Sequence, residues 1–270
     1  MDIQGSPERF GPASILWKTC VLLSWLAAFA SGTARADHKA PVNITGTWNA
    51  NFSGGMDLLL HQDGNRVWGK DNTGYLIRGD WNDGKLVLFY RLDFNGQPGS
   101  SCSAPVVAVV TSHGTATKLE GVEFLSSGDT QPRTMTRASP NPGADTPYPY
   151  GAELSVCGSL PAHDLVFASG SDKLDGSDWP LLAAVADVLK KDTGMKIQIL
   201  GHTDSVGDAA KNKTLSQKRA DAVKKVLVDK YKADPGRITT KGWGQEQPLV
   251  SNDTEDGRGV NRRVELLVVK

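Results

Sequence analysis

The chain has 270 residues, of which 39% are hydrophobic and 22% charged, a composition typical of a folded protein with one or two domains. Thirty basic and thirty acidic side chains give a formal net charge of zero, so no overall basic field favours binding to nucleic acid or anionic lipid. No stretch reaches the roughly 18 to 20 uninterrupted apolar residues of a membrane helix, which excludes a polytopic helical membrane protein.

Residues 1–36 have the pattern of a secretory signal peptide. An apolar run from Val21 to Ala30 follows the basic residues Arg9 and Lys18. Ala34-Arg35-Ala36, just after the run, has the spacing of a cleavage site. We expect cleavage after Ala36 and export of the remaining chain. The alternative is an uncleaved amphipathic anchor.

Export leaves two cysteines, Cys102 and Cys157, because Cys20 is removed with the leader. An even pair in an oxidising compartment predicts a disulfide between them, and two buried thiols are the alternative. The bond closes a loop of about 55 residues and stabilises the fold by roughly 4 kcal/mol in the chain-entropy model. The sequence contains no CxxC, HExxH or zinc-type spacing of Cys and His, so we expect no metal site and no cofactor.

Residues 37–130 are predicted to form a β-rich module. Apolar residues alternate at 56–60 and again at 86–92, and Asp-Gly turns at 63–64 and 83–84 separate the segments. This pattern indicates antiparallel hairpins that form a small barrel or sandwich. Gly46-Thr47-Trp48 gives a weak similarity to lipocalin-like barrels, and a buried tryptophan explains the same residues. The segment is too short for an outer-membrane barrel and lacks a consistent lipid-facing side, so we expect a soluble module.

Residues 131–150 contain five of the 14 prolines, surrounded by Gly, Ser, Asn and Asp, which is typical of a semi-stiff linker. Residues 151–270 form the second predicted domain. Cys102 lies in the β-rich module and Cys157 just beyond the linker. A bond between them would therefore limit motion between the two domains.

Strands and helices alternate in this second domain. We predict a strand at 165–168, a helix from Pro180 to Lys191, a strand at 196–200, a polar loop at 201–212, a helix with a capping box at Thr214 and Gln217, and strands at 237–241 and 263–269. This β-α-β-α-β-β order predicts an α+β fold with a mixed sheet on which the helices pack.

Arg219 lies at the edge of the buried stripe of the second helix, in an otherwise apolar row. The row consists of Leu215, Val223 and Leu227. An unpaired charge there would cost several kcal/mol, and the nearest predicted carboxylate is Asp204, just after the preceding strand. Two interpretations remain open. The pair either orders the loop as an ion pair, or it receives a zwitterionic ligand whose carboxylate binds Arg219 and the helix N-terminus.

Several spaced motifs in this half resemble the OmpA-like peptidoglycan-binding domain. They are Phe167 to Leu174, Gly201 to Gly207 (GHTDSVG), Asn212, Leu215-Ser216, Arg219-Ala220, Gly242-Trp243-Gly244, Ser251 to Thr254 and Asn261 to Glu265. The resemblance covers residues 164–270, with the motifs in the right order. It departs at Ala168, where many members have an acidic residue, and at Val260, where many have Lys or another polar residue.

The resemblance implies noncovalent binding of the peptide stem of bacterial peptidoglycan, with a diaminopimelate residue in the pocket. By carry-over, Asp204 and Arg219 form the central pair that receives the zwitterionic end of this residue. Further hydrogen bonds to the stem come from Asn212, Asn261 and Arg262. Each charge-assisted bond is expected to contribute about 1.5 to 3 kcal/mol. The alternative for the Asn261-Arg262 segment is a solvated edge.

We therefore expect an adaptor rather than an enzyme, in the periplasm of a Gram-negative bacterium and associated with the cell wall and outer membrane. The second domain docks on peptidoglycan, and the β-rich module meets an unknown envelope protein or the outer membrane. The alternative is a periplasmic small-ligand carrier or sugar-processing enzyme in the β-rich module, merely tethered by the tail. A deep apolar cavity would indicate the carrier, and convergent acids in a cleft would indicate the enzyme.

Overall fold

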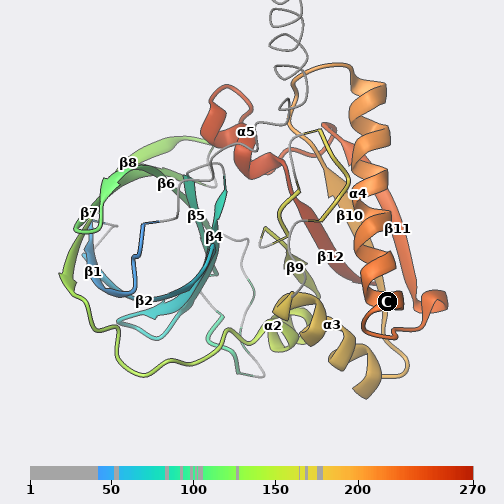
Figure 1. Ribbon diagram of the computed structural model, residues 1–270, viewed down its shortest axis with the longest axis horizontal. Coiled ribbons are helices and arrows are strands. Elements are labelled where there is room, and N and C mark those ends of the chain that lie inside the picture. Colours follow the sequence, from blue (N-terminus) through green and yellow to red (C-terminus); the bar gives the residue numbers. More distant parts are fainter. Residues whose placement is uncertain are drawn as a thin grey trace, which may run out of the picture. The chain divides into compact units, whose positions relative to one another are not determined.

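Eight antiparallel strands form the N-terminal part of the structure, a computed structural model (Figure 1). They are β1 (Gly46–Ala50), β2 (Met56–Asp63), β3 (Arg66–Asp71), β4 (Leu76–Asn82), β5 (Lys85–Tyr90), β6 (Val106–Thr115), β7 (Lys118–Phe124) and β8 (Thr130–Ser139). Each strand pairs with the next and β8 pairs with β1, so the sheet curls round and closes on itself. These strands and their loops are called the β module below.

The structure describes residues 42–51, 55–82, 85–91, 94–97, 100, 102, 106–125, 128–163, 165–167, 170–174 and 179–269. The predicted signal peptide and the predicted turn at 83–84 lie outside these residues. The predicted antiparallel hairpins are confirmed. The turn between β2 and β3 lies at 64–65, one residue later than predicted, because Asp63 still pairs with Arg66. Residues 40–270 group into one unit by their internal contacts.

Strand β8 takes up the first half of the segment that its proline content predicted to be a linker. Pro132 lies within β8, opposite Val122 of β7. Among the described residues, β1 pairs with residues 135–139 of β8, so Pro132 lies beyond this pairing, where the N–H that proline lacks is not needed by β1. The connection to the next domain is therefore confined to residues 140–149.

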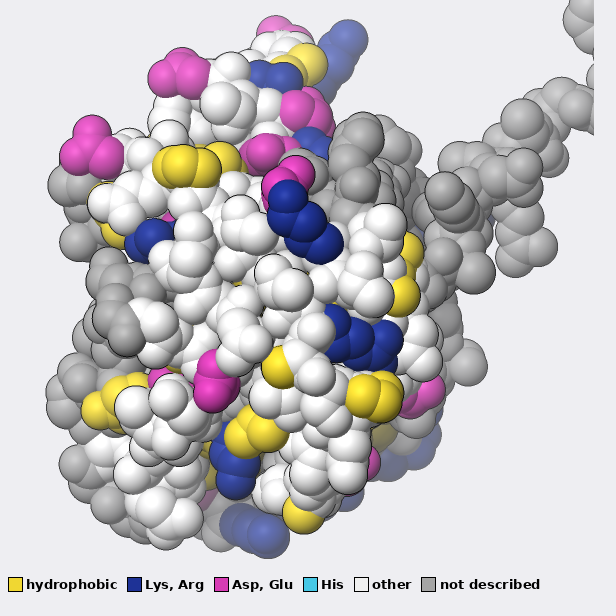
Figure 2. All heavy atoms as spheres, turned by 90° about the vertical axis from the view of Figure 1, so that its left-hand side faces the viewer, with side chains coloured by type: hydrophobic (Ala, Val, Ile, Leu, Met, Phe, Trp, Pro, Cys, Tyr) yellow, Lys and Arg dark blue, Asp and Glu magenta, His cyan; other side chains and the backbone are white. Residues whose placement is uncertain are grey.

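Alternate side chains of the β module point inward and form one apolar core. Its buried members are Ile44, Trp48, Ala50, Leu58, Leu60, Val67, Ile77, Trp81, Leu86, Leu88, Leu119 and Met135. On β4 and β5 the opposite face is buried as well. Arg78, Asp80, Val87 and Phe89 lie on that outer face. Over the described part of the surface in Figure 2, hydrophobic side chains are scattered among polar ones.

The C-terminal domain contains a mixed sheet with helices packed on it (Figure 1). Its elements are α2 (Tyr150–Cys157), β9 (Ser159–Pro161), α3 (Pro180–Lys191), β10 (Lys196–His202), α4 (Ala209–Asp229), the short η1 (Pro235–Arg237), β11 (Ile238–Gly244), α5 (Glu255–Asn261) and β12 (Val264–Val269). The sheet order is β11-β10-β12-β9, with β10 parallel to β11 and antiparallel to β12. The predicted mixed sheet is confirmed. Among the described residues, no helix is long and apolar enough to cross a membrane.

Three elements of this domain differ from the prediction. The described part of the strand predicted at 165–168, residues 165–167, forms an isolated bridge between Phe167 and Leu174, and β9 forms the edge of the sheet. Helix α4 begins before the predicted cap at Thr214, because the Asp208 side chain accepts a hydrogen bond from the Lys211 N–H at 2.9 Å and caps the helix there. Helix α5 was not predicted, since it has two glycines among seven residues.

A disulfide and buried ion pairs join the β module to the C-terminal domain. The predicted bond between Cys102 and Cys157 is present. Glu153 of α2, only 1% exposed, accepts a hydrogen bond from Nε of Arg78 at 3.1 Å and another from Nε of Arg91 at 2.9 Å. One buried carboxylate of the C-terminal domain is thus shared by two arginines of the β module.

Candidate ligand-binding site

Two glycines allow helix α4 to approach the edge of the sheet where the candidate site lies. A Cβ on Gly201 of β10 would lie 2.0 Å from the carbonyl oxygen of Ser216, and one on Gly242 of β11 would lie 2.4 Å from the backbone nitrogen of Gln217. Any other residue at these positions would push α4 away from the sheet. The close approach brings the loop after β10 and the first turns of α4 to the same opening.

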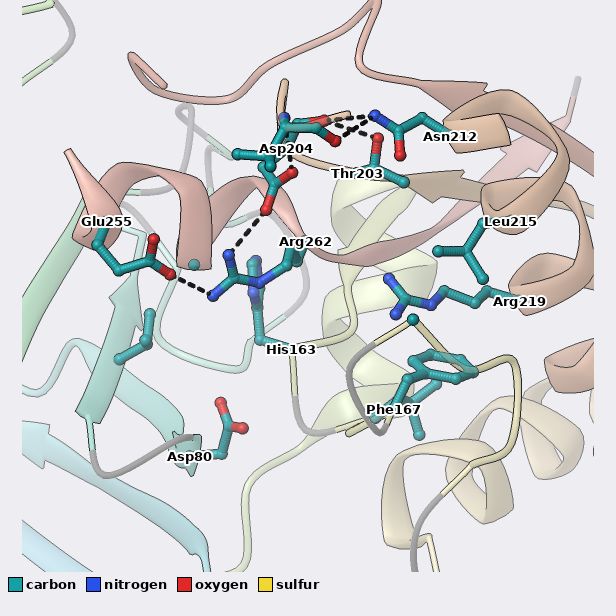
Figure 3. Close-up of a pocket in the computed structure, with 15 residues that line it drawn as sticks. Asp80, His163, Phe167, Thr203, Asp204, Asn212, Leu215, Arg219, Glu255 and Arg262 are labelled. Carbon is teal, nitrogen blue, oxygen red and sulfur yellow. Dashed lines mark hydrogen bonds and ion pairs between the residues drawn. The ribbon is translucent and has the colours of Figure 1, made fainter. Parts of the chain in front are cut away.

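A pocket of about 340 Å³ opens at this place, which is the size of a small-molecule site (Figure 3). Its polar and charged lining residues are Asp80, His163, Thr203, Asp204, Asn212, Arg219, Glu255 and Arg262. Leu165, Phe167, Val206 and Leu215 are among the apolar ones. Four of the five predicted binding residues, Asp204, Asn212, Arg219 and Arg262, therefore line one pocket.

Asp204 forms its ion pair with Arg262, at the end of α5, and not with Arg219. Its Oδ2 accepts a hydrogen bond from Nη1 of Arg262 at 2.8 Å, and its Oδ1 accepts one from the Val206 N–H at 3.0 Å. Nη2 of Arg262 donates to Glu255 at 3.0 Å. Burial acts to lower the pKa of Arg262, but its hydrogen bonds to Asp204 and Glu255 outweigh burial and raise it. The pairing suggested by the sequence is corrected accordingly.

Arg219 reaches the pocket from α4 with part of its guanidinium unused. Nε donates to the Ser171 carbonyl at 2.9 Å, and Cζ lies 5.1 Å from the centroid of the Phe167 ring. Its two η nitrogens have no hydrogen-bond acceptor in the part of the chain that the structure describes. Burial and the charge of Arg262 lower the pKa of Arg219, but a guanidinium stays protonated at neutral pH. The η nitrogens of Arg219 are therefore available to donate hydrogen bonds to a ligand.

Asn212 lines the pocket and also holds the loop beside it. Its Nδ2 donates to the Val206 carbonyl at 3.0 Å and to Oε1 of Gln245 at 3.1 Å. These bonds connect the loop after β10 to the segment after β11. Asn212 thereby stabilises the loop that carries Asp204.

Asn261 lies outside the pocket, although the resemblance implied a role for it in binding. It is fully buried, and its Oδ1 accepts hydrogen bonds from the N–H groups of Leu249 and Val250 at 2.8 and 3.1 Å. Its Nδ2 donates to the Val250 carbonyl at 2.8 Å. The side chain is thus used to fix the 249–250 segment against α5.

Glu255, Asp80 and His163 also line the pocket, although the sequence did not indicate them as site residues. Glu255 and Arg262 are seven residues apart, a spacing that places two residues on the same face of a helix. Their proximity could therefore have been predicted from the sequence. The place of Asp80 and His163 in the pocket could not, because only the tertiary fold brings β4 and the segment after β9 to this pocket. Burial, followed by the charge of Arg263, lowers the pKa of His163 well below its usual value, so its imidazole is neutral.

Comparison with known proteins places part of the chain in a family. The model of the OmpA family matches residues 166–262. Outer membrane porin F of Pseudomonas aeruginosa is 38% identical over 102 residues, which are 38% of this chain and 29% of that protein. Peptidoglycan-binding protein ArfA of Mycobacterium bovis is 35% identical over 133 residues, which are 49% of this chain and 40% of that protein.

Among solved structures, the peptidoglycan-associated lipoprotein from Burkholderia pseudomallei is 28% identical, with a TM-score of 0.37, and the match covers 39% of this chain and 88% of that one. The chain spans less than half the length of the two curated relatives named above. The family match contains the four predicted residues that line the pocket. Residues 166–262 of this chain form a domain of the OmpA family.

Proposed function

We propose that this protein binds peptidoglycan noncovalently through the pocket of its C-terminal domain and so holds the β module at the cell wall. The observation that carries the proposal is the state of Arg219, a buried cation, 5% exposed, whose η nitrogens have no acceptor among the described residues. Such a group favours a ligand carboxylate, because charge-assisted hydrogen bonds are about twice as strong as neutral ones. The OmpA family match and the Mycobacterium bovis relative, which is named as a peptidoglycan-binding protein, support the cell wall as the source of that carboxylate.

In detail, the ligand is the diaminopimelate residue of the stem peptide, whose side-chain end carries an ammonium beside a carboxylate. Arg219 binds the carboxylate, and Asp204 faces the ammonium. Asp204 is 14% exposed and already oriented by Arg262 and by the loop, so little ordering is left to occur on binding. Repeated stems along the polymer keep a released domain near its next site, so a modest affinity per site is sufficient.

The same proposal places the protein in the periplasm of a Gram-negative bacterium, at the cell wall and outer membrane. The Pseudomonas aeruginosa relative, which is named as an outer membrane porin, supports a location in such an envelope. Cleavage of residues 1–36 and an envelope protein or the outer membrane as partner of the β module stay predictions.

We favour an adaptor over the carrier or enzyme that the sequence left open for the β module. Interior positions of the closed sheet hold large side chains that pack on one another, such as Trp48, Leu60 and Leu88, each no more than 1% exposed. Packing of this kind supports a structural or interaction role for the module. The absence of enzymatic activity stays a prediction.

Cosedimentation with purified peptidoglycan sacculi tests the proposed function. The exported chain should pellet with the sacculi. Arg219→Gln and Asp204→Asn should each weaken binding by about tenfold or more, because each removes one charged partner of the ligand. Lys218→Gln is the matched control, since it removes the same charge from an exposed neighbour on α4, and it should pellet like the wild type.

Thermal unfolding of each variant separates loss of the site from loss of the fold. If Arg219→Gln keeps the wild-type unfolding temperature and pellets as well as Lys218→Gln, the pocket is not the binding site. If the wild-type chain itself stays in the supernatant, the proposed function is wrong.

A further inference from the structure

Helix α5 forms one wall of the pocket with a single face. Glu255, Gly259 and Arg262 line the pocket. Their spacing of four and then three residues places them on the same side of a helix. Figure 3 shows Glu255 and Arg262 bonded to each other at this wall, with Asp204 as the second partner of Arg262. The geometry of the pocket therefore depends on where α5 lies.

Strand β5 of the β module contacts a second face of α5. Lys85, at the start of β5, forms an ion pair with Asp256. Four residues further along α5, Val260 is fully buried in an apolar cluster that also contains Val87 and Phe89 of β5. Residues 256 and 260 are one helical turn apart and lie on the same side of the helix. One strand of the β module therefore holds one whole face of α5.

The remaining face of α5 packs on the segment that precedes it. A Cβ on Gly257 would lie 2.0 Å from the carbonyl oxygen of Ser251. One turn later, Asn261 accepts hydrogen bonds from the N–H groups of Leu249 and Val250 at 2.8 and 3.1 Å. Helix α5 is thus held between this segment and β5.

Helix α5 has little stability of its own. It contains only seven residues, two of which are glycines, and so short a helix does not persist in water without packing. Its position is therefore determined by the contacts on its two other faces. The OmpA family match covers residues 166–262, so the contact with β5 is an addition to what that family domain supplies.

We infer that strand β5 fixes the position of Arg262 through helix α5, and that Lys85 and Asp256 are therefore positioning residues for ligand binding. This inference rests on the proposed function. Neither Lys85 nor Asp256 is among the described residues that line the pocket, so their effect on a ligand passes through α5. Arg262 orients Asp204 with a hydrogen bond of 2.8 Å, and a displaced α5 would remove that support. By the same linkage, a bound ligand holds α5 more firmly on β5.

Calorimetric titration of the exported chain with the synthetic stem tripeptide alanyl-γ-glutamyl-diaminopimelate tests the inference through charge reversal. Lys85→Glu and Asp256→Lys should each weaken binding by about fivefold or more, because like charges then face each other between β5 and α5. The double variant restores an ion pair of reversed sense. It should bind within about twofold of the wild type, because the two changes compensate each other at one contact.

Lys118→Glu is the matched control, because it makes the same charge change in the β module at an exposed ion pair with Glu120, within β7. It should bind the tripeptide like the wild type. If Lys85→Glu and Asp256→Lys bind as tightly as this control, the inference is overturned. A loss of affinity in the single variants that the double variant does not recover overturns it as well, since the pair is then not the cause.

Side-chain NMR of the ligand-free chain gives a second readout, which general destabilisation would not change. Rotation of the Arg262 guanidinium should be slow in the wild type, because Asp204 and Glu255 each hold one of its η nitrogens. It should be severalfold faster in Lys85→Glu and slow again in the double variant.

The two readouts separate failure of the inference from failure of the proposed function. If the wild type pellets with sacculi but Lys85→Glu changes neither the affinity nor the rotation of Arg262, the inference fails and the proposed function stands. If the wild type neither pellets nor binds the tripeptide, the proposed function fails. The rotation of Arg262 then still decides whether β5 positions this residue.

Discussion

Single residues determine the site through the way their charges are paired. Arg262 is shared by Asp204 and Glu255, whereas Arg219 donates a hydrogen bond only from its Nε to the residues that the structure describes. The two guanidiniums therefore have different tasks. Arg262 orients the acid, and the free donors of Arg219 face the ligand that we propose.

The buried histidine of β10 gives a prediction at the residue scale. Burial and then the charge of Arg263 lower the pKa of His202 to about 4, whereas the unfolded chain takes up this proton near pH 6.5. The unfolded state binds more protons between these values, so the free energy of unfolding should fall as pH drops from about 6.5 to 4. The loss from this residue is about 3 kcal/mol in total, and His163 acts in the same direction.

Urea unfolding at about pH 7 and at about pH 4.5 measures this effect. His202→Gln should lose much less stability between the two conditions than the wild type, because the titrating group is gone. Equal losses in both proteins would mean that His202 does not titrate as the structure indicates.

The sequence predicted the position of a residue correctly where its type and its place in a helix or strand determine its burial. Arg219 is buried within the stripe of α4, as its spacing indicated. The partner of Asp204 was missed because Arg262 is 58 positions away and is presented by a helix that the pattern did not show. Asn261 was misassigned, since only the structure shows that its amide is used by the neighbouring segment.

At the scale of elements, the site exists because α4 lies directly on the ends of β10 and β11. Gly201→Ala should destabilise the domain by about 1 to 3 kcal/mol or more, since the new Cβ would meet the Ser216 carbonyl at 2.0 Å and force α4 outward. Binding to sacculi should weaken as well, because α4 carries Arg219. Gly194→Ala is the control, since its Cβ would lie 3.5 Å from the nearest atom, on Asp192.

Urea unfolding and cosedimentation of the two glycine variants check this prediction. If Gly201→Ala has the unfolding midpoint and the affinity of Gly194→Ala, the close approach of α4 does not build the site.

Long amphipathic elements could be predicted from the sequence, and short or irregular ones could not. The positions of α3 and β10 could be predicted because their apolar residues recur at helical spacing in α3 and at every second position in β10. The predicted N-terminus of α4 was wrong because Thr214 and Gln217 have the spacing of a capping box. In the structure the Thr214 hydroxyl lies inside the helix and donates to the Ala210 carbonyl.

At the scale of the whole molecule, the β module and the C-terminal domain pack against each other through apolar side chains, and both line the pocket. The Cys102–Cys157 disulfide and the buried Glu153 with its two arginines hold the modules together. The sequence predicted the disulfide from the cysteine count, but no local pattern indicated that Asp80 of one module would line the pocket of the other.

Competition for sacculi by soluble stem tripeptides tests most directly the claim that Arg219 binds a ligand carboxylate in this pocket. The free diaminopimelate tripeptide should release the exported chain from sacculi. The same tripeptide with its side-chain carboxylate converted to an amide should be weaker by about tenfold or more, because Arg219 then loses its charged acceptor. Equal release by the two tripeptides would contradict the account.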